Sequence, residues 1–225
     1  MLLLRLSGHS GAGKSRLTAA LPRYGISCPR AVLYTSRDRR EGEVDGTDYY
    51  FRSRESIEAL ARQSFLVGPV REMLQAVDLN GLESDLKGND LVLIEIFDKL
   101  WPGVETAIVG RLGHELRTAS VFMTAVDPHR LVSMPDDQER AAFVRAEVQR
   151  ILEWRKKDPP DKIQSRAKSA AEEVLAAISP NSPYKKVFHS SQEGPDGEDE
   201  WTREDEPIGR AAQVLREFIR FVQAV

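Results

Sequence analysis

The sequence predicts an α/β fold, a three-layer sandwich in which helices cover a parallel sheet on both faces. The first observation is that short apolar runs alternate with longer segments of helical periodicity along the chain. The second is a glycine-rich turn between the first apolar run and the first helical segment. A chain of 225 residues is long enough to bury the core of such a domain.

The apolar runs are the expected strands. Three of them are almost uninterrupted, as buried parallel strands are, and they cover residues 2–6, 91–96 and 121–126. We expect residues 184–189 to add a fourth strand, and residues 31–35 are a candidate for one more.

The helical segments lie between these runs, with apolar residues recurring at spacings of three and four. They cover residues 16–21, 53–62, 104–116, 136–157, 163–178 and 208–224. Core packing is the expected role of one apolar stripe, with a subunit contact as the alternative; it consists of Phe143, Val144, Val148, Ile151 and Leu152. Residues 192–207 are acidic and broken by proline and glycine, which favours a solvated loop.

The turn after the first strand has the pattern G-x-x-x-x-G-K-S, and the strand–loop–helix context predicts that it binds the phosphates of a nucleoside triphosphate. Glycines let the backbone N–H groups point at phosphate oxygens, the lysine spans the terminal phosphates, and the serine hydroxyl is a ligand for Mg²⁺. This pattern predicts a P-loop NTPase fold. The expected binding residues are Gly8, His9, Ser10, Gly11, Ala12, Gly13, Lys14 and Ser15.

Composition narrows the function class. The net charge of −3 argues against nucleic acid or a membrane surface as a partner. The single cysteine, Cys28, excludes an internal disulfide. The apolar start ends within six residues, without a basic leader or a long apolar stretch, so we expect a cytoplasmic protein. Monomer and homodimer both remain open.

Residues 35–51 read TSRDRREGEVDGTDYYF. This segment closely resembles the T-T-R-x-P-R-x-G-E-x-x-G-x-D-Y-x-F segment of guanylate kinases, with departures at Ser36 and Arg39. With the phosphate loop, the resemblance implies an enzyme that transfers the γ-phosphoryl group of ATP to a nucleoside monophosphate, GMP before others, with Mg²⁺ as cofactor. A kinase of a different phosphorylated small molecule and a binding or regulatory module without transferase activity are the alternatives.

The resemblance also implies which residues hold the acceptor. Arg37, Arg40 and Tyr49 match the family's monophosphate-binding residues, and arginine forks suit the oxygens of a phosphate. Glu43 is expected to hold an arginine or a water molecule in place. Glu95 ends an apolar strand and is expected on the acceptor or, together with Ser15, on the metal ion.

A lid is expected at residues 131–179, where Arg155 and Arg166 resemble the two arginines that close over the transferred phosphoryl group in this family. Lys156 and Lys157 are possible substitutes. Arg155, Arg166 and Lys14 are the expected catalytic residues. The whole chain, 1–225, is expected to form one domain: a core of 1–32, 90–130 and 180–225, an acceptor region of 33–89, and the lid with an insertion.

The positions that read guanine in the family are changed. Leu33 stands where the family has a serine, and Val67 stands where it has a glutamate. Nearby polar residues that are able to take over are Asp78, Asn80 and Glu83. The sequence therefore predicts that the phosphate grip is kept, whereas the means of recognising the base has changed.

Overall fold

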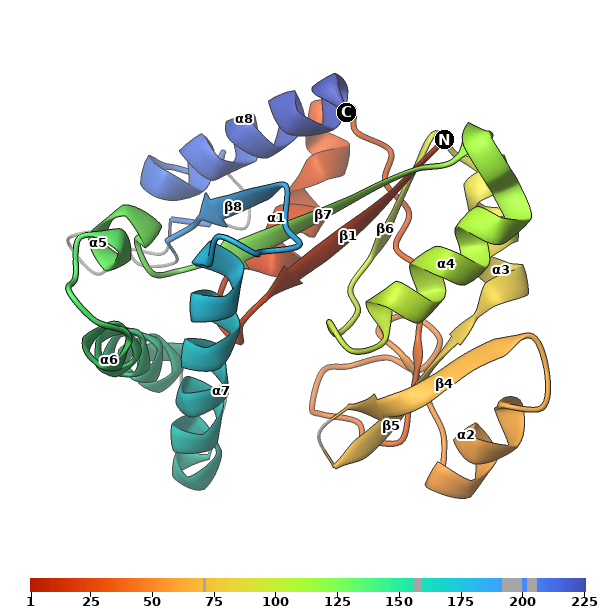
Figure 1. Ribbon diagram of the computed structural model, residues 1–225, viewed down its shortest axis with the longest axis horizontal. Coiled ribbons are helices and arrows are strands. Elements are labelled where there is room, and N and C mark those ends of the chain that lie inside the picture. Colours follow the sequence, from red (N-terminus) through yellow and green to blue (C-terminus); the bar gives the residue numbers. More distant parts are fainter. Residues whose placement is uncertain (71, 156–158, 192–199, 202–205) are drawn as a thin grey trace. The chain divides into compact units, whose positions relative to one another are not determined.

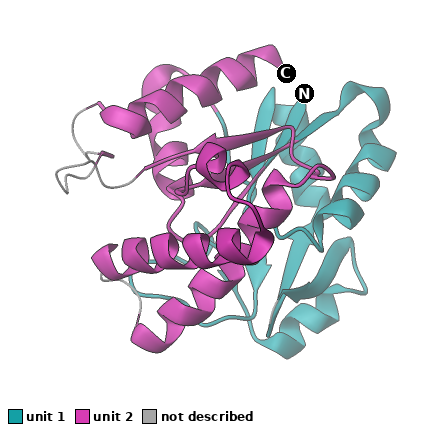
Figure 2. Ribbon diagram, turned by 60° about the vertical axis from the view of Figure 1, so that its left-hand side comes forward, with its two compact units in different colours: residues 1–5, 28–119 teal, residues 6–27, 120–225 magenta. Residues whose placement is uncertain are grey.

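The computed structural model describes residues 1–70, 72–155, 159–191, 200–201 and 206–225 (Figure 1). The chain divides into two compact units, each described by itself below. Unit 1 comprises residues 1–5 and 28–119, and unit 2 comprises residues 6–27 and 120–225 (Figure 2). The architecture is mixed α/β with a parallel sheet, as predicted. Within the described residues, no helix has the length and hydropathy needed to cross a membrane.

The parallel sheet has the strand order β6-β1-β7-β8. In unit 1, β1 pairs with β6 from Leu2 opposite Leu91 to Arg5 opposite Ile94. In unit 2, β7 pairs with β8 from Val121 to Thr124. All four runs expected from their apolar character are strands, with bounds β1 (Leu2–Gly8), β6 (Leu91–Ile94), β7 (Arg117–Thr124) and β8 (Lys186–His189).

Two helices of unit 1 pack on the β1–β6 pair: α3 (Leu79–Gly88) and α4 (Trp101–Leu112), the second followed by a 3₁₀ turn, η2 (Gly113–Glu115). Their buried side chains, among them Leu82 and Val104, join Leu3 and Val92 in one cluster. Helix α3 was absent from the sequence prediction because its two glycines and its charged residues hide the periodicity. Asp78 caps it, accepting hydrogen bonds from the backbone N–H groups of Asn80 and Gly81.

A second sheet of unit 1 has the order β3-β2-β5-β4. Its strands are β2 (Tyr34–Thr35), β3 (Tyr50–Phe51), β4 (Phe65–Val70) and β5 (Met73–Asp78), and α2 (Arg54–Leu60) packs on one face through Ile57. The expectation that residues 31–35 form a strand of the parallel sheet is therefore wrong. Ala31 donates a hydrogen bond to Leu93 of β6, but Tyr34 and Thr35 pair with β5, a partner that the sequence pattern alone does not reveal.

Helices lie on both faces of the β7–β8 pair in unit 2. Helices α6 (Asp137–Arg155) and α7 (Pro160–Ile178) share a buried cluster that includes Phe122 and against which Val187 packs. On the other face, Phe188 packs against Phe218 of α8 (Gly209–Ala224), with the two tilted rings 5.5 Å apart between centroids. The cluster contains Val144, Val148 and Leu152, so the expected stripe of α6 is core packing within this unit. The remaining elements are α1 (Lys14–Ala20), η1 (Leu21–Tyr24) and α5 (Pro128–Val132).

Part of the acidic stretch is ordered against unit 2. Glu200 and Trp201 are buried, at 5% and 4% exposure, although we expected a solvated loop over 192–207. Glu200 is buried because its carboxylate accepts a hydrogen bond from the N–H of Ala211 in the first turn of α8. Most of the rest of that stretch lies outside the described residues, as do Lys156 and Lys157.

Candidate functional site

The glycine-rich loop, residues 8–15, follows β1 in unit 2. Gly11 and Gly13 have φ angles of +88° and +86°, which L side chains rarely adopt. Gly8 is constrained sterically, since a Cβ there would lie 2.3 Å from the carbonyl oxygen of Met123. The glycines of the motif are thus required by the backbone path itself.

Lys14 begins α1 and turns its side chain back onto the loop. Its Nζ donates hydrogen bonds to the carbonyl oxygens of Gly8 and His9, the latter at 3.3 Å. The ammonium group therefore lies against the loop backbone. Ser15 follows in the first helical turn, and its residue surface is exposed.

His9 anchors the loop to the end of β7. Its ring is buried, and its Nε2 accepts a hydrogen bond of 3.0 Å from the backbone N–H of Ala125. The ring proton is therefore on Nδ1, which donates to the carbonyl of Ser10 at 2.8 Å. Burial, reinforced by the charge of Lys14 and opposed by the Ser10 contact, lowers the pKa of His9 to about 4. The side chain of His9 is thus a neutral anchor of the loop and does not project toward solvent.

One of the two expected lid arginines lies beside this loop. Nη1 of Arg155, at the end of α6, is 3.5 Å from the position that a Cβ on Gly11 would occupy. Arg166 is half-buried on α7.

Trp201 also touches the loop, and sequence reasoning missed it. Its Nε1 is 3.5 Å from the position of a Cβ on Gly13 and donates to the carbonyl of Ser191 at 2.9 Å. Arg16 of α1 donates in turn to the Trp201 carbonyl at 3.3 Å. A lone tryptophan within an acidic stretch was the available signal, since large aromatic side chains are seldom left in solvent.

The arginine–tyrosine segment, residues 35–51, lies in unit 1. Arg37 meets Glu43 through two hydrogen bonds, Nη1 to Oε2 at 2.7 Å and Nη2 to Oε1 at 2.5 Å, and it also donates to the carbonyl of Asp38. These bonds use three of the five N–H donors of a guanidinium. Glu43 thereby orients Arg37 without using all of its donors, and the remaining N–H groups are able to pair with an anion.

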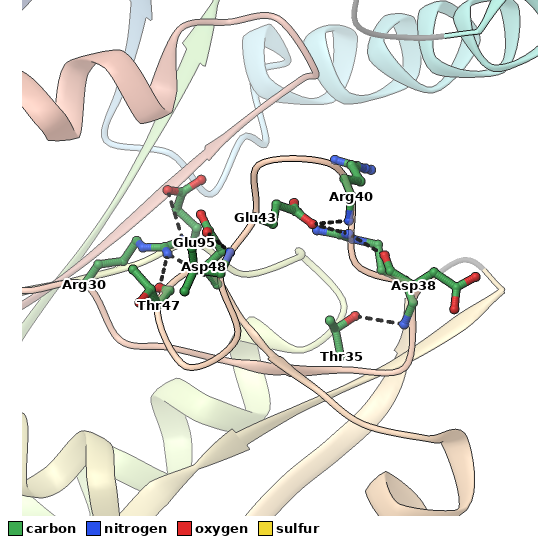
Figure 3. A network of polar contacts seen from close by, with 10 residues as sticks. Arg30, Thr35, Asp38, Arg40, Glu43, Thr47, Asp48 and Glu95 are labelled. Carbon is green, nitrogen blue, oxygen red and sulfur yellow. Dashed lines mark hydrogen bonds and ion pairs between the residues drawn. The ribbon is translucent and has the colours of Figure 1, made fainter.

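Glu43 also organises the backbone around it. Its Oε2 accepts from the backbone N–H of Arg40 at 2.8 Å, as the close view shows (Figure 3). Partial burial raises the pKa of Glu43, but the hydrogen bonds from Arg37 and Arg40 and the charges of both arginines outweigh it, so the pKa lies below its usual value. Arg40 itself is an exposed residue.

Tyr49 packs beside Arg37, whose guanidinium carbon lies 5.2 Å from the Tyr49 ring centre and 5.3 Å from that of Phe51. Burial and the negative charge of Glu95 raise the pKa of Tyr49, against the opposing charges of Arg30 and Arg37. Its hydroxyl therefore stays protonated and able to donate a hydrogen bond.

Glu95 follows the last residue of β6 and is paired with Arg30. Their closest atoms are 3.9 Å apart, and Arg30 also donates to the carbonyls of Thr47 and Asp48, at 2.6 and 3.1 Å (Figure 3). Arg30 thus ties Glu95 to the turn that carries Tyr49. Sequence reasoning did not single out Arg30. The next acid, Asp98, pairs with the buried guanidinium of Arg5.

The residues that were expected to replace the base readers are engaged elsewhere. Asp78 caps α3, Asn80 accepts a hydrogen bond from Arg111 at 2.8 Å, and Glu83 pairs with Lys87 and Arg111. Leu33 is buried in the unit 1 core, and Val67 packs with the cluster under α2. Among the described contacts, no hydrogen bond or ion pair links the side chains of Asp78, Asn80 or Glu83 to the arginine–tyrosine segment.

Comparison with known proteins gives the family. The guanylate kinase family model matches residues 1–68, which contain both the glycine-rich loop and the arginine–tyrosine segment. A guanylate kinase of Cereibacter sphaeroides is 33% identical over 156 residues, covering 64% of this chain and 69% of that protein. The chain belongs to the guanylate kinase family. The enzyme class predicted from the sequence, a guanylate-kinase-like nucleoside monophosphate kinase, is thereby confirmed.

Two further guanylate kinases are similar to this chain. The match to that of Lactobacillus delbrueckii subsp. bulgaricus has 39% identity over 102 residues, 39% of this chain and 50% of that protein. The crystal structure of guanylate kinase from Anaplasma phagocytophilum superposes with a TM-score of 0.54 at 18% identity, covering 99% of this chain and 85% of that one. The match to the Anaplasma phagocytophilum structure supports the fold.

Proposed function

We propose that this protein transfers the γ-phosphoryl group of ATP to a nucleoside monophosphate, with GMP as the leading acceptor. The observation that carries the proposal is the Arg37–Glu43 pair. An arginine held by two hydrogen bonds, with N–H donors left over and a protonated tyrosine beside it, is preorganised to hold a phosphate. The same 68 residues that carry this grip also carry the triphosphate loop, and the family model spans both.

In this proposal the donor is held by residues 8–15, and the acceptor monophosphate by Arg37, Arg40 and Tyr49. Lys14 neutralises charge on the donor phosphates, while Arg155 and Arg166 stabilise the charge that spreads over the equatorial oxygens of the transferred group. Transfer is in line between two held anions, so no side chain serves as a covalent nucleophile. Positioning and electrostatic stabilisation supply the rate enhancement.

Bound Mg²⁺ would neutralise the phosphates of ATP, and the oxygen donor that fits it in this chain is the hydroxyl of Ser15. Glu95 had two possible roles, toward the metal ion or toward the acceptor. Its pairing with Arg30 and its influence on Tyr49 favour the acceptor side, because a cation already neutralises this carboxylate. We therefore assign Glu95 to the acceptor pocket.

The test is an assay that couples ADP release to a colour change, run with ATP·Mg and a panel of acceptors. The panel contains GMP, dGMP, AMP, CMP, UMP and sugar phosphates. We expect ADP formation that depends on the acceptor, greatest with a purine monophosphate. Slow ADP formation that is the same with and without every acceptor would overturn the proposal.

A further inference from the structure

Gln75 stands in the middle of β5 with an unmet hydrogen-bonding group. The residue is 4% exposed, and its Oε1 is buried without a hydrogen-bond partner among the described residues. Buried side-chain oxygens are paired in the large majority of cases in native proteins, and an unpaired one is destabilising. The Oε1 of Gln75 therefore needs a hydrogen-bond donor that the described residues do not supply.

The sheet register shows which face Gln75 occupies. Thr35 of β2 is paired with Gln75 on one side and with Phe51 of β3 on the other, and Gly68 of β4 is paired with Gln75 across the remaining strand. Directly paired residues point to the same face of a sheet. Phe51, Thr35, Gln75 and Gly68 thus form one row across the sheet.

This row lies on the same face of the sheet as Arg37, the central residue of the proposed phosphate-binding group. The guanidinium of Arg37 lies over Phe51, at one end of the row, and Thr35 Oγ1 accepts from the backbone N–H of Arg37 at 3.4 Å (Figure 3). The alternate residues Leu74 and Ala76 face α2 on the other side. Strands lie about 4.8 Å apart, so Gln75 is roughly 10 Å from Phe51, two strands further along the row.

The far end of the row is closed by an apolar side chain. A Cβ on Gly68 would lie 2.3 Å from Cδ2 of Leu100, so Leu100 occupies the space that a side chain at position 68 would fill. From one end to the other, this face carries an arginine over an aromatic ring, a hydroxyl, a carboxamide and an apolar wall. A planar, partly polar group attached to a phosphate matches that order.

A carboxamide presents one acceptor and one donor side by side. A 6-oxopurine presents the complementary pair, the N1–H donor beside the O6 acceptor. We propose that Gln75 reads this edge of the acceptor nucleotide, with Oε1 accepting from N1–H and Nε2 donating to O6. This inference rests on the proposed function and identifies the base-reading residue of that same site.

The arrangement leaves the 2-amino group of guanine unread. A carboxamide has no second acceptor atom to offer it, and Val67 faces α2. Glu95 is paired with Arg30, and the side chains of Asp78, Asn80 and Glu83 are held by other groups. The enzyme therefore accepts GMP and IMP alike.

The first measurement compares acceptors with the wild-type protein. We expect kcat/KM values for GMP and IMP within about threefold of each other, because none of the described side chains considered above is left to accept from the 2-amino group. A preference of about a hundredfold or more for GMP would overturn the inference, since it would require a second acceptor beside the base.

The second measurement uses variants. In Gln75→Leu, kcat/KM for both nucleotides should fall about tenfold to a hundredfold, mainly through KM, while the melting temperature stays equal or rises because the unpaired oxygen is gone. In Gln75→Glu, the added acceptor should raise the GMP/IMP ratio about tenfold or more. Gln63→Leu, at an exposed glutamine just before β4, is the matched control and should change neither quantity.

The outcomes separate this inference from the proposed function. If GMP is phosphorylated but both Gln75 variants keep the wild-type kcat/KM and ratio, the inference is wrong and the proposed function stands. If no acceptor supports ADP formation, the proposed function fails, and calorimetric titration of GMP and IMP decides the inference. Binding that is lost in Gln75→Leu supports it, whereas equal binding, or none to the wild-type protein, overturns it.

Discussion

The glycine-rich loop of unit 2 and the acceptor region of unit 1 both carry groups suited to phosphate, but the sequence encodes them differently. Residues 8–15 contain nearly all the groups that shape the loop. Three glycines allow its backbone path, and Lys14 donates hydrogen bonds to the carbonyl oxygens of Gly8 and His9 within the same loop. The acceptor region combines a contiguous arginine–tyrosine segment with a row of residues from four strands. The first region is a local motif, and the second depends on sheet register.

The difference teaches where a family likeness can be trusted. Binding a phosphate requires N–H donors and positive charge, which a short segment is able to supply. Recognising a nucleotide base requires donors and acceptors at fixed positions, and here packed strands provide those positions. The segments that match the family's phosphate-binding motifs are therefore retained in this chain, while the proposed base reader lies on another strand.

Lys14→Ala is the strongest test of the local motif. Because the ammonium acts on charge that develops during transfer, kcat should fall about a hundredfold to a thousandfold while the KM for the acceptor changes little. The coupled ADP assay measures both. Lys87→Ala, which removes an exposed lysine of α3, is the control and should keep wild-type activity. An equal, slight loss in both variants would contradict the role of Lys14.

His9 tests whether the loop depends on its anchor to β7. Its pKa is about 4 in the folded state and about 6.5 when unfolded, so the unfolded chain binds the proton first as pH falls. Stability is then full above pH 6.5 and lost progressively from about pH 6.5 to about pH 4, by an amount on the order of 3 kcal/mol. Urea unfolding at several pH values measures this loss.

The control for that experiment is His9→Asn, which removes the titrating ring. The difference in pH dependence between the two proteins isolates His9 from the carboxylates that titrate in the same range. Parallel curves for both proteins would show that the ring is not buried in its neutral form.

Arg37→Lys tests the acceptor side without changing the net charge. Lysine keeps the positive charge but loses the planar fork that bonds Glu43, so the KM for the acceptor should rise about tenfold to a hundredfold. Arg52→Lys is the matched control, since Arg52 lies just past the same segment and pairs with exposed Asp45. An unchanged KM in Arg37→Lys would mean that charge alone matters, whereas a rise of equal size in both variants would mean that the effect is not specific to Arg37.

Glu43→Gln should have the smallest effect. The amide still accepts one hydrogen bond, but it loses the second acceptor and the negative charge that orient Arg37, so the KM for the acceptor should rise about threefold to tenfold. Steady-state kinetics in the same assay measures the change. An unchanged KM would indicate that Arg37 is oriented by Tyr49 and Phe51 instead.

Much of the fold could be predicted because uninterrupted apolar runs and long periodic segments leave few alternatives. The runs at 2–6 and 121–126 are strands of the parallel sheet, and the stripe of α6 is core. Residues 31–35 were assigned to the wrong sheet because an apolar run indicates a strand but does not indicate which strand it pairs with. Helix α3 was not predicted because its two glycines and its charged residues obscure the apolar periodicity.

The candidate site divides in the same way. Arg37, Glu43 and Tyr49 belong to one short segment of the sequence, and in the structure Arg37 contacts both Glu43 and Tyr49. Trp201 and Arg30 were missed because each belongs to no motif and acts through partners distant in sequence. Gln75 carried one weak signal, a polar residue within a buried apolar strand.

By itself, the sequence determined the glycine-rich loop, the arginine–tyrosine segment and the alternating order of strands and helices. Each of these depends on residues that are neighbours in the chain, where backbone preferences and side-chain spacing act directly. Only the tertiary structure decided that Thr35, Gln75 and Gly68 share one face with the phosphate grip. The physical reason is strand register. A shift of the pairing by one residue would move every side chain of a strand to the opposite face of the sheet, and the residue pattern of a single strand does not specify its pairing.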